Sequence, residues 1–160
     1  HSNVGASDLC GTNFSGASLN GLKATRAVLS GANFEQASMN GAVFYNATLD
    51  ATNFYDCSLI DANFSSAILD RAVFCDSDLA DADFNRAKLR QSEFLNTKLP
   101  HANFRHAHLQ GSIFENSEFH NTEFGLAWIQ GAEFYGTGIQ VDDREGARFE
   151  NGTFFPAAIS

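Results

Sequence analysis

The chain has 160 residues, of which 44% are hydrophobic and 18% charged, and 19 acidic against 10 basic residues give it a net charge of −9. This composition is too apolar for an intrinsically disordered protein, and no run approaches the roughly 18 apolar residues of a membrane-spanning helix. The excess of acid argues against direct binding to nucleic acid or anionic membranes, because such binding depends on clustered cations.

A repeat of five residues runs through the chain. At 30 of the 32 positions reached in steps of five from Val4 to Ile159, the residue is Val, Leu, Ile, Met or Phe. Two residues before these centres, 30 of 32 positions hold Ala, Ser, Thr, Cys or Gly. Five residues match neither the period of a helix nor that of a strand, so the chain must turn after each pentapeptide. This pattern predicts an all-β solenoid.

In chain order, two places depart from the repeat. At Leu22 and Ala24 the large and small residues exchange positions, which keeps the predicted interior filled. At Asp142 and Arg144 both inward positions are polar, so we expect one bulged side over residues 141–146. The repeat then resumes in the same phase, and we expect a single domain over residues 1–160.

The number of sides in each coil follows from which residue types fall into each column when the repeat centres of successive coils are stacked. Stacked coils place equivalent residues over one another, about 4.8 Å apart. A three-sided coil would alternate Phe and Leu in each column, whereas a four-sided coil of 20 residues separates them. We number the sides by their first centres: side 1 from Val4, side 2 from Leu9, side 3 from Phe14 and side 4 from Leu19. Side 3 then has Phe at every centre, and the chain makes about eight coils.

Several units resemble the A(D/N)LXX unit of pentapeptide-repeat proteins: Ala32–Gln36, Ala62–Ser66, Ala82–Arg86 and Ala102–His106. The resemblance covers essentially the whole chain and implies a right-handed, four-sided β-helix. It does not imply one function, because the family includes quinolone-resistance proteins that act on DNA gyrase, secreted effectors and proteins of cyanobacteria and plastid lumens. Gyrase-binding members carry protruding loops and a C-terminal helix, and this chain has neither beyond the side that contains Asp142.

The predicted interior leaves no concave site for catalysis, since it is filled with Phe and Leu. The chain also lacks the GxxxxGK[ST], GxSxG and HExxH motifs. We therefore expect no enzyme activity, no catalytic residue and no cofactor. Histidines gather between His101 and His120, but each patch offers at most two ligands where zinc takes four, so we expect no metal site.

The three cysteines are not expected to form a disulfide. Cys57 takes an inward small position, whereas Cys10 and Cys75 take outward positions, so their Cβ atoms do not converge. Free thiols favour a reducing cytoplasm. No signal peptide opens the chain, and a leader removed earlier stays open as an alternative.

Charge is uneven over the four sides. Side 3 carries six acidic residues and no basic one, side 4 carries a net −3, and the other two sides balance. Side 3 also presents outward aromatic and aliphatic residues, which often anchor protein interfaces, although an exposed β-wall prefers such residues anyway. The candidate partner-binding residues are Glu35, Tyr55, Asp56, Asp76, Glu93, Leu95, Ile113, Glu115, Glu133 and Tyr135.

Three functions remain open on this evidence. The first is a non-catalytic module that binds an unidentified protein through side 3. The second, suggested by the family resemblance, is a DNA mimic that binds a type II topoisomerase such as DNA gyrase. The acidic stretch spans about 24 Å, over which duplex DNA presents ~14 charges, so the mimicry is partial. The third is a structural spacer.

The C-terminal end of the solenoid is expected to be apolar. Its residues Phe149, Phe154, Phe155 and Ile159 would be left uncovered in the last coil. Solenoids normally need polar caps at their ends. We therefore expect either a homodimer through the last coil or capping segments beyond this chain.

Overall fold

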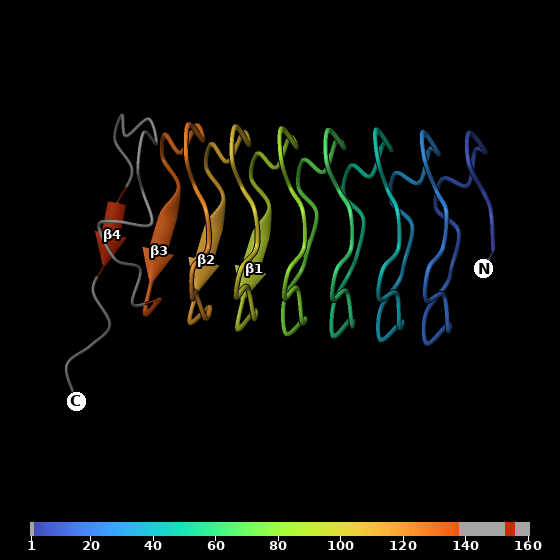
Figure 1. Ribbon diagram of the computed structural model, residues 1–160, viewed down its shortest axis with the longest axis horizontal. Coiled ribbons are helices and arrows are strands. Elements are labelled where there is room, and N and C mark those ends of the chain that lie inside the picture. The colour runs from blue at the N-terminus through green and yellow to red at the C-terminus, as the bar shows by residue number, and fades with distance from the viewer. Residues whose placement is uncertain (1, 138–152, 156–160) are drawn as a thin grey trace.

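A computed structural model describes residues 2–137 and 153–155, which form a rod of stacked coils (Figure 1). Four short strands lie on side 3: β1 (Glu93–Leu95), β2 (Ile113–Glu115), β3 (Glu133–Tyr135) and β4 (Thr153–Phe155). They pair in parallel in this order, each with the strand of the next coil. The part of the chain that the structure describes contains no helix able to cross a membrane.

Every pairing joins residues 20 apart, on all four sides. Single parallel bridges run from Asn3 with Lys23 to His108 with Trp128, and the strand registers continue the same spacing. The prediction of an all-β, four-sided solenoid is therefore confirmed.

Each side ends in a tight turn with one residue in the left-handed conformation. Positive φ, between 52° and 69°, occurs at nineteen non-glycine and eight glycine residues, which are all the positions two after a centre from Ala6 to Gly136. This is the third position of a type II turn, which favours Gly and Asn. The amide of the next residue closes the turn, as where Ala17 N–H donates to the Phe14 carbonyl at 3.0 Å.

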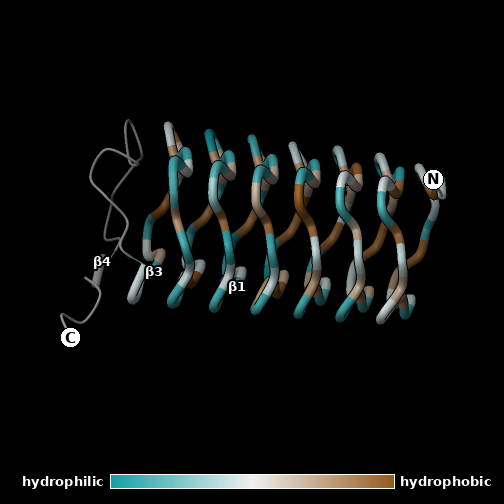
Figure 2. Tube along the Cα trace, turned by 60° about the horizontal axis from the view of Figure 1, so that its bottom comes forward, coloured by the Kyte–Doolittle hydropathy of each residue, from teal (hydrophilic) through white to brown (hydrophobic). Residues whose placement is uncertain are grey.

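The core is built from two opposed columns of phenylalanine, on sides 1 and 3. Within a column the rings stack, as Phe34 does on Phe54 at 5.3 Å between centroids. Between columns the rings meet edge to face, as Phe34 and Phe44 do at 6.1 Å and 73°. Figure 2 shows hydrophobic residues returning at the same place in successive coils. The interior is thus a continuous aromatic stack, with aliphatic side chains from sides 2 and 4 around it.

The small inward positions fill the rest of the interior. Leu22 and Ala24 are both buried, so the predicted exchange of sizes is confirmed. Buried thiol and hydroxyl groups in one corner column donate to carbonyls of the preceding coil, as Cys57 Sγ does to Phe34 O at 2.9 Å and Ser77 Oγ to Phe54 O at 2.5 Å. The polar atoms of Cys57 and Ser77 therefore have partners, as buried groups require, whereas Oγ1 of Thr137 in the same column has no partner among the described residues.

The cysteines are all free, as predicted, and two of them, Cys57 and Cys75, are buried. Cys75 takes an outward position and is nevertheless buried, because it is a small side chain between Tyr55 and Leu95 in the same outward column. Burial raises the pKa of Cys75, and it raises the pKa of Cys57 to about 11.

Two predictions concern parts of the chain outside the described residues. One is the bulge over residues 141–146. The other is the end-to-end contact, because Phe149 and Ile159 lie outside and only the backbone of Phe154 and Phe155, in β4, is described. Both stay predictions.

Candidate functional site

The ten candidate residues lie together on side 3, six of them on the three strands β1 to β3. In each strand the central Phe points inward and its two neighbours point outward, as strand geometry requires. The register pairs Glu93 with Ile113 and Ile113 with Glu133, while Leu95 pairs with Glu115 and Glu115 with Tyr135. Acidic and apolar side chains therefore alternate both along and across the strands. We call these six residues the checkerboard.

The other four candidates lie on the coils before β1. Glu35 is half-buried, and Tyr55, Asp56 and Asp76 are exposed. Tyr55 shares its outward column with Leu95, and buried Cys75 lies between the two, so this group lies on the same side as the checkerboard and is separated from it by one coil in that column. The structure thus places all ten candidates on one acidic side of the rod, with acids and apolar side chains alternating in the checkerboard.

Neighbouring side-chain amides hold two of these carboxylates. Gln36 Nε2 donates to Asp56 at 3.3 Å, and Asn96 Nδ2 donates to Asp76 at 3.0 Å. Sequence reasoning missed both amides. Their positions could have indicated these contacts, because each amide is 20 residues from an acid in the same corner column, where neighbouring side chains can reach one another.

A ladder of asparagines positions two further candidates. Asn33 Oδ1 accepts from the backbone N–H of Glu35 at 3.0 Å, and Asn53 Oδ1 accepts from that of Tyr55 at 2.9 Å. Asn53 Nδ2 also donates to Asn33 at 3.0 Å, which links the two coils. Asn before the central Phe is the sequence signal for this turn, because Asn and Asp side chains bond to the backbone two residues on.

Among the described residues, the acids of side 3 form no ion pair. The two ion pairs present there, Asp70 with Arg90 and Glu123 with Arg105, lie on sides 2 and 1. The negative charge of side 3 is therefore not neutralised by any ion pair within residues 2–137.

Hydrogen bonds to these acids raise the pKa of two tyrosines. The hydrogen bond to Asp76 is the largest cause of the raised pKa of Tyr55. For Tyr135 it is the bond to Glu133, whose carboxylate accepts from the hydroxyl at 2.8 Å. Both phenols therefore stay neutral donors at neutral pH.

The surface is flat and only partly apolar. Tyr55 is 40% exposed, whereas Leu95, Ile113 and Tyr135 are half-buried against their neighbours along the wall.

The histidine cluster gains no further ligand in the fold. The rings of His101 and His120 lie 5.6 Å apart. Within residues 2–137, no group of three or more His, Cys, Asp or Glu side chains could hold a metal ion.

Two family descriptions match the chain. The pentapeptide repeat region matches residues 47–124 and 67–153, and the eight-copy pentapeptide repeats match residues 1–31 and 27–65. These are families of non-enzymatic repeat proteins, so the prediction of no enzyme activity is confirmed. Their fold is the right-handed β-helix that the resemblance implied. No curated protein matches the chain significantly.

Among solved structures, the chain is similar to two trypsin-treated variants of QnrB1, described as a plasmid-mediated fluoroquinolone resistance protein. One has a TM-score of 0.79 at 16% identity, over 95% of this chain and 74% of that chain. The other has a TM-score of 0.75 at 17% identity, over 96% of this chain and 80% of that chain. At this identity the likeness establishes the fold alone.

Proposed function

Since this chain belongs to the pentapeptide-repeat family, we propose that it is a non-catalytic module that binds a partner protein through side 3. The checkerboard carries this proposal. It offers carboxylates that form no ion pair with any described residue, alternating with apolar side chains on one side of the rod.

The chemistry of the checkerboard defines the partner it fits. Carboxylates that form no ion pair within the described part of the chain complement Lys or Arg on another surface, which aids encounter and register. Leu95, Ile113 and Tyr135 add apolar area, which supplies affinity where water is excluded. The matching partner is therefore a protein surface on which basic and apolar side chains alternate.

A charge-reversal experiment tests the proposal. The triple variant Glu93→Lys, Glu115→Lys and Glu133→Lys changes three carboxylates of the checkerboard. A matched control makes the same change at three acids of side 4, Asp61, Asp81 and Glu118, all of them exposed. We expect proteins captured from the source lysate by the wild type to be lost with the first variant and kept with the control.

The outcomes of this experiment distinguish binding through the checkerboard from binding that depends only on the net charge of the protein. Equal loss in both variants would mean that net charge alone governs capture. Capture that persists in both would contradict a role for the checkerboard. Circular dichroism of both variants must match the wild type, so that unfolding does not imitate a lost contact.

A second candidate function is DNA mimicry directed at a type II topoisomerase. The likeness in fold to QnrB1 and the acidic surface of side 3 favour it. The alternation of acids with apolar side chains weighs against it, because DNA presents an unbroken row of phosphates. A gyrase supercoiling assay decides: no change at tens of micromolar protein would remove this candidate. If neither function is supported, the structural spacer remains.

A further inference from the structure

Two exposed histidines at the end of side 4 are joined across consecutive coils. The backbone N–H of His101 donates to the carbonyl of His120 at 2.7 Å. Their rings meet edge to face, with 5.6 Å between centroids. Both residues are exposed. Because the backbone bond fixes the distance between the two residues, their imidazoles stay neighbours whichever rotamers they adopt.

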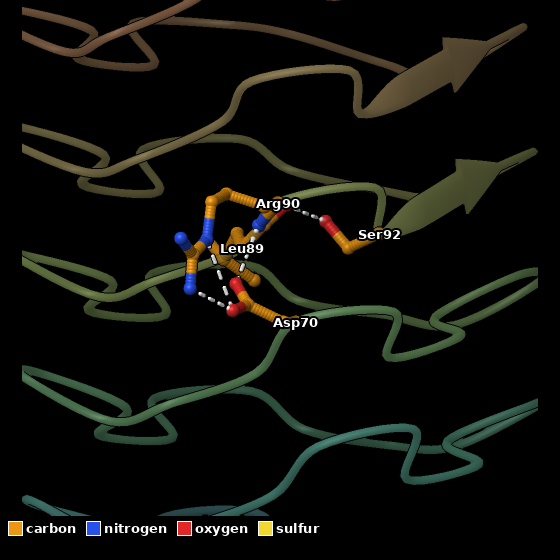
Figure 3. Close-up of polar contacts among 4 residues, drawn as sticks. All are labelled: Asp70, Leu89, Arg90 and Ser92. Carbon is orange, nitrogen blue, oxygen red and sulfur yellow. Dashed lines mark hydrogen bonds and ion pairs between the residues drawn. The ribbon is translucent and has the colours of Figure 1, made fainter.

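Outward side chains of consecutive coils contact one another elsewhere on the rod. On side 2, Asp70 Oδ2 accepts from Arg90 Nε at 3.0 Å across one coil (Figure 3). This contact is possible because neighbouring coils lie about 4.8 Å apart. The same spacing on side 4 allows a single bound ion to contact both His101 and His120.

The distance between the two rings fits a shared metal ion. A histidine nitrogen binds such an ion at about 2.0–2.1 Å, which places the ring centroid ~3.1 Å from the metal. Two rings on one ion therefore lie ~4.4 Å apart when the two bonds form a right angle, and ~6.2 Å apart when the bonds point in opposite directions. The observed 5.6 Å falls between these limits.

The surroundings of the pair attract cations. Asp81 stands one coil before His101 in the same corner column, and Glu118 lies two residues before His120. Both acids are exposed, and neither forms an ion pair with any residue that the structure describes. Side 4 carries a net −3, with Lys98 as its one basic residue. A surface of this sign raises the local concentration of cations.

We propose that His101 and His120 bind one divalent late transition-metal ion, with water in its remaining coordination positions. Imidazole is a ligand suited to Zn²⁺, Ni²⁺ and Cu²⁺, and of these Cu²⁺ binds most strongly. The site differs from a structural zinc site, which takes four protein ligands. It lies on side 4 and does not depend on the function proposed for the checkerboard.

A bound ion links two neighbouring coils. Its two ligands lie a full coil apart in the chain, at positions 101 and 120, and folding brings them together. The ion therefore binds the folded protein more tightly than the unfolded chain, and a ligand with this preference stabilises the fold. We expect the metal to raise the midpoint of thermal unfolding.

Amide NMR and thermal unfolding with Ni²⁺ test the proposal. Ni²⁺ is the probe because Cu²⁺ can oxidise the exposed thiol of Cys10. We expect Ni²⁺ to change the amide resonances of His101 and His120 saturably and to raise the unfolding midpoint. Both effects should be lost in His101→Asn and in His120→Asn. Asparagine suits both positions, since Asn121 and Asn40 occupy the same two columns.

His106→Asn is the matched control, because His106 and His101 are both corner residues with a φ of 59°. We expect this variant to bind Ni²⁺ as the wild type does. Mg²⁺ is the second control, since it prefers oxygen ligands and so measures the attraction of the acidic side alone. The proposal is overturned if Ni²⁺ causes no saturable change, if His101→Asn or His120→Asn retains the change, if His106→Asn loses it equally, or if Mg²⁺ produces the same effect.

Discussion

Replacing Phe74 by alanine tests how the aromatic stack stabilises the rod. Phe74 is fully buried and stacks on Phe54 and Phe94, each at 4.9 Å between centroids. It also meets Phe64 at 5.7 Å and Phe84 at 5.6 Å, both edge to face. Removing a buried Phe costs about 3–5 kcal/mol, and aromatic pairs contribute ~0.5–1.5 kcal/mol each beyond their area. We expect Phe74→Ala to lower the free energy of unfolding by about 4–5 kcal/mol.

Phe14→Ala is the internal comparison. Phe14 is only half-buried and its ring contact is with Phe34, at 4.9 Å. We expect this variant to lose about half as much, because one end coil can fray without opening its neighbours. Urea unfolding followed by circular dichroism measures both changes. Equal losses for the two variants would refute the claim that the stabilising unit is the central stack.

Three further outcomes follow from individual residues. Leu126 has a φ of 59° and is 42% exposed, so Leu126→Asn should raise the free energy of unfolding by about 0.5–1 kcal/mol in urea titrations. Because Asp76 raises the pKa of Tyr55, Asp76→Asn should lower that pKa in a phenolate absorbance titration. The stability that this contact contributes is fully present below the ordinary tyrosine pKa, and it is lost as the pH rises through the raised pKa of Tyr55. Cys57 is buried and its pKa is raised to about 11, whereas Cys10 is exposed although Asp8 raises its pKa, so a thiol reagent at neutral pH should modify Cys10 in the folded protein and leave Cys57 unmodified.

Each of these outcomes has a control. Leu95 lacks a positive φ, so Leu95→Asn should not stabilise the chain, and a gain there would contradict the role of the corner conformation. Tyr55→Phe identifies the titration of Tyr55, and an unchanged midpoint in Asp76→Asn would refute the coupling. Buried Cys75 should react only after denaturation, and its rapid reaction in the folded state would contradict its burial.

The period of the repeat was enough to predict most of the fold. In a solenoid each residue contacts its equivalents one coil away, so sequence distance translates directly into spatial distance. That is why the stack of Phe34 on Phe54 and the exchange at Leu22 and Ala24 could be predicted without coordinates. The same logic placed the ten candidate residues on one side of the rod.

The left-handed corners were not predicted, although eight glycines at these positions were a signal. The signal was weak because the other corners hold residues such as Leu126 and Arg71, which seldom adopt this conformation alone. Stacking of the coils imposes it, since the corner amide bonds to the next coil, as Gly16 N–H does to the Glu35 carbonyl at 2.8 Å.

The sequence by itself determined the number of sides, the sorting of the core columns and the side that carries the acid, because all three depend only on which residues are twenty apart. The tertiary structure alone decided which outward groups find partners. Asp70 is bound by Arg90, whereas Arg71 forms no ion pair with any residue that the structure describes, and Cys75 is buried while Tyr55 is exposed. These outcomes depend on side-chain length and direction within a column, which a period does not encode.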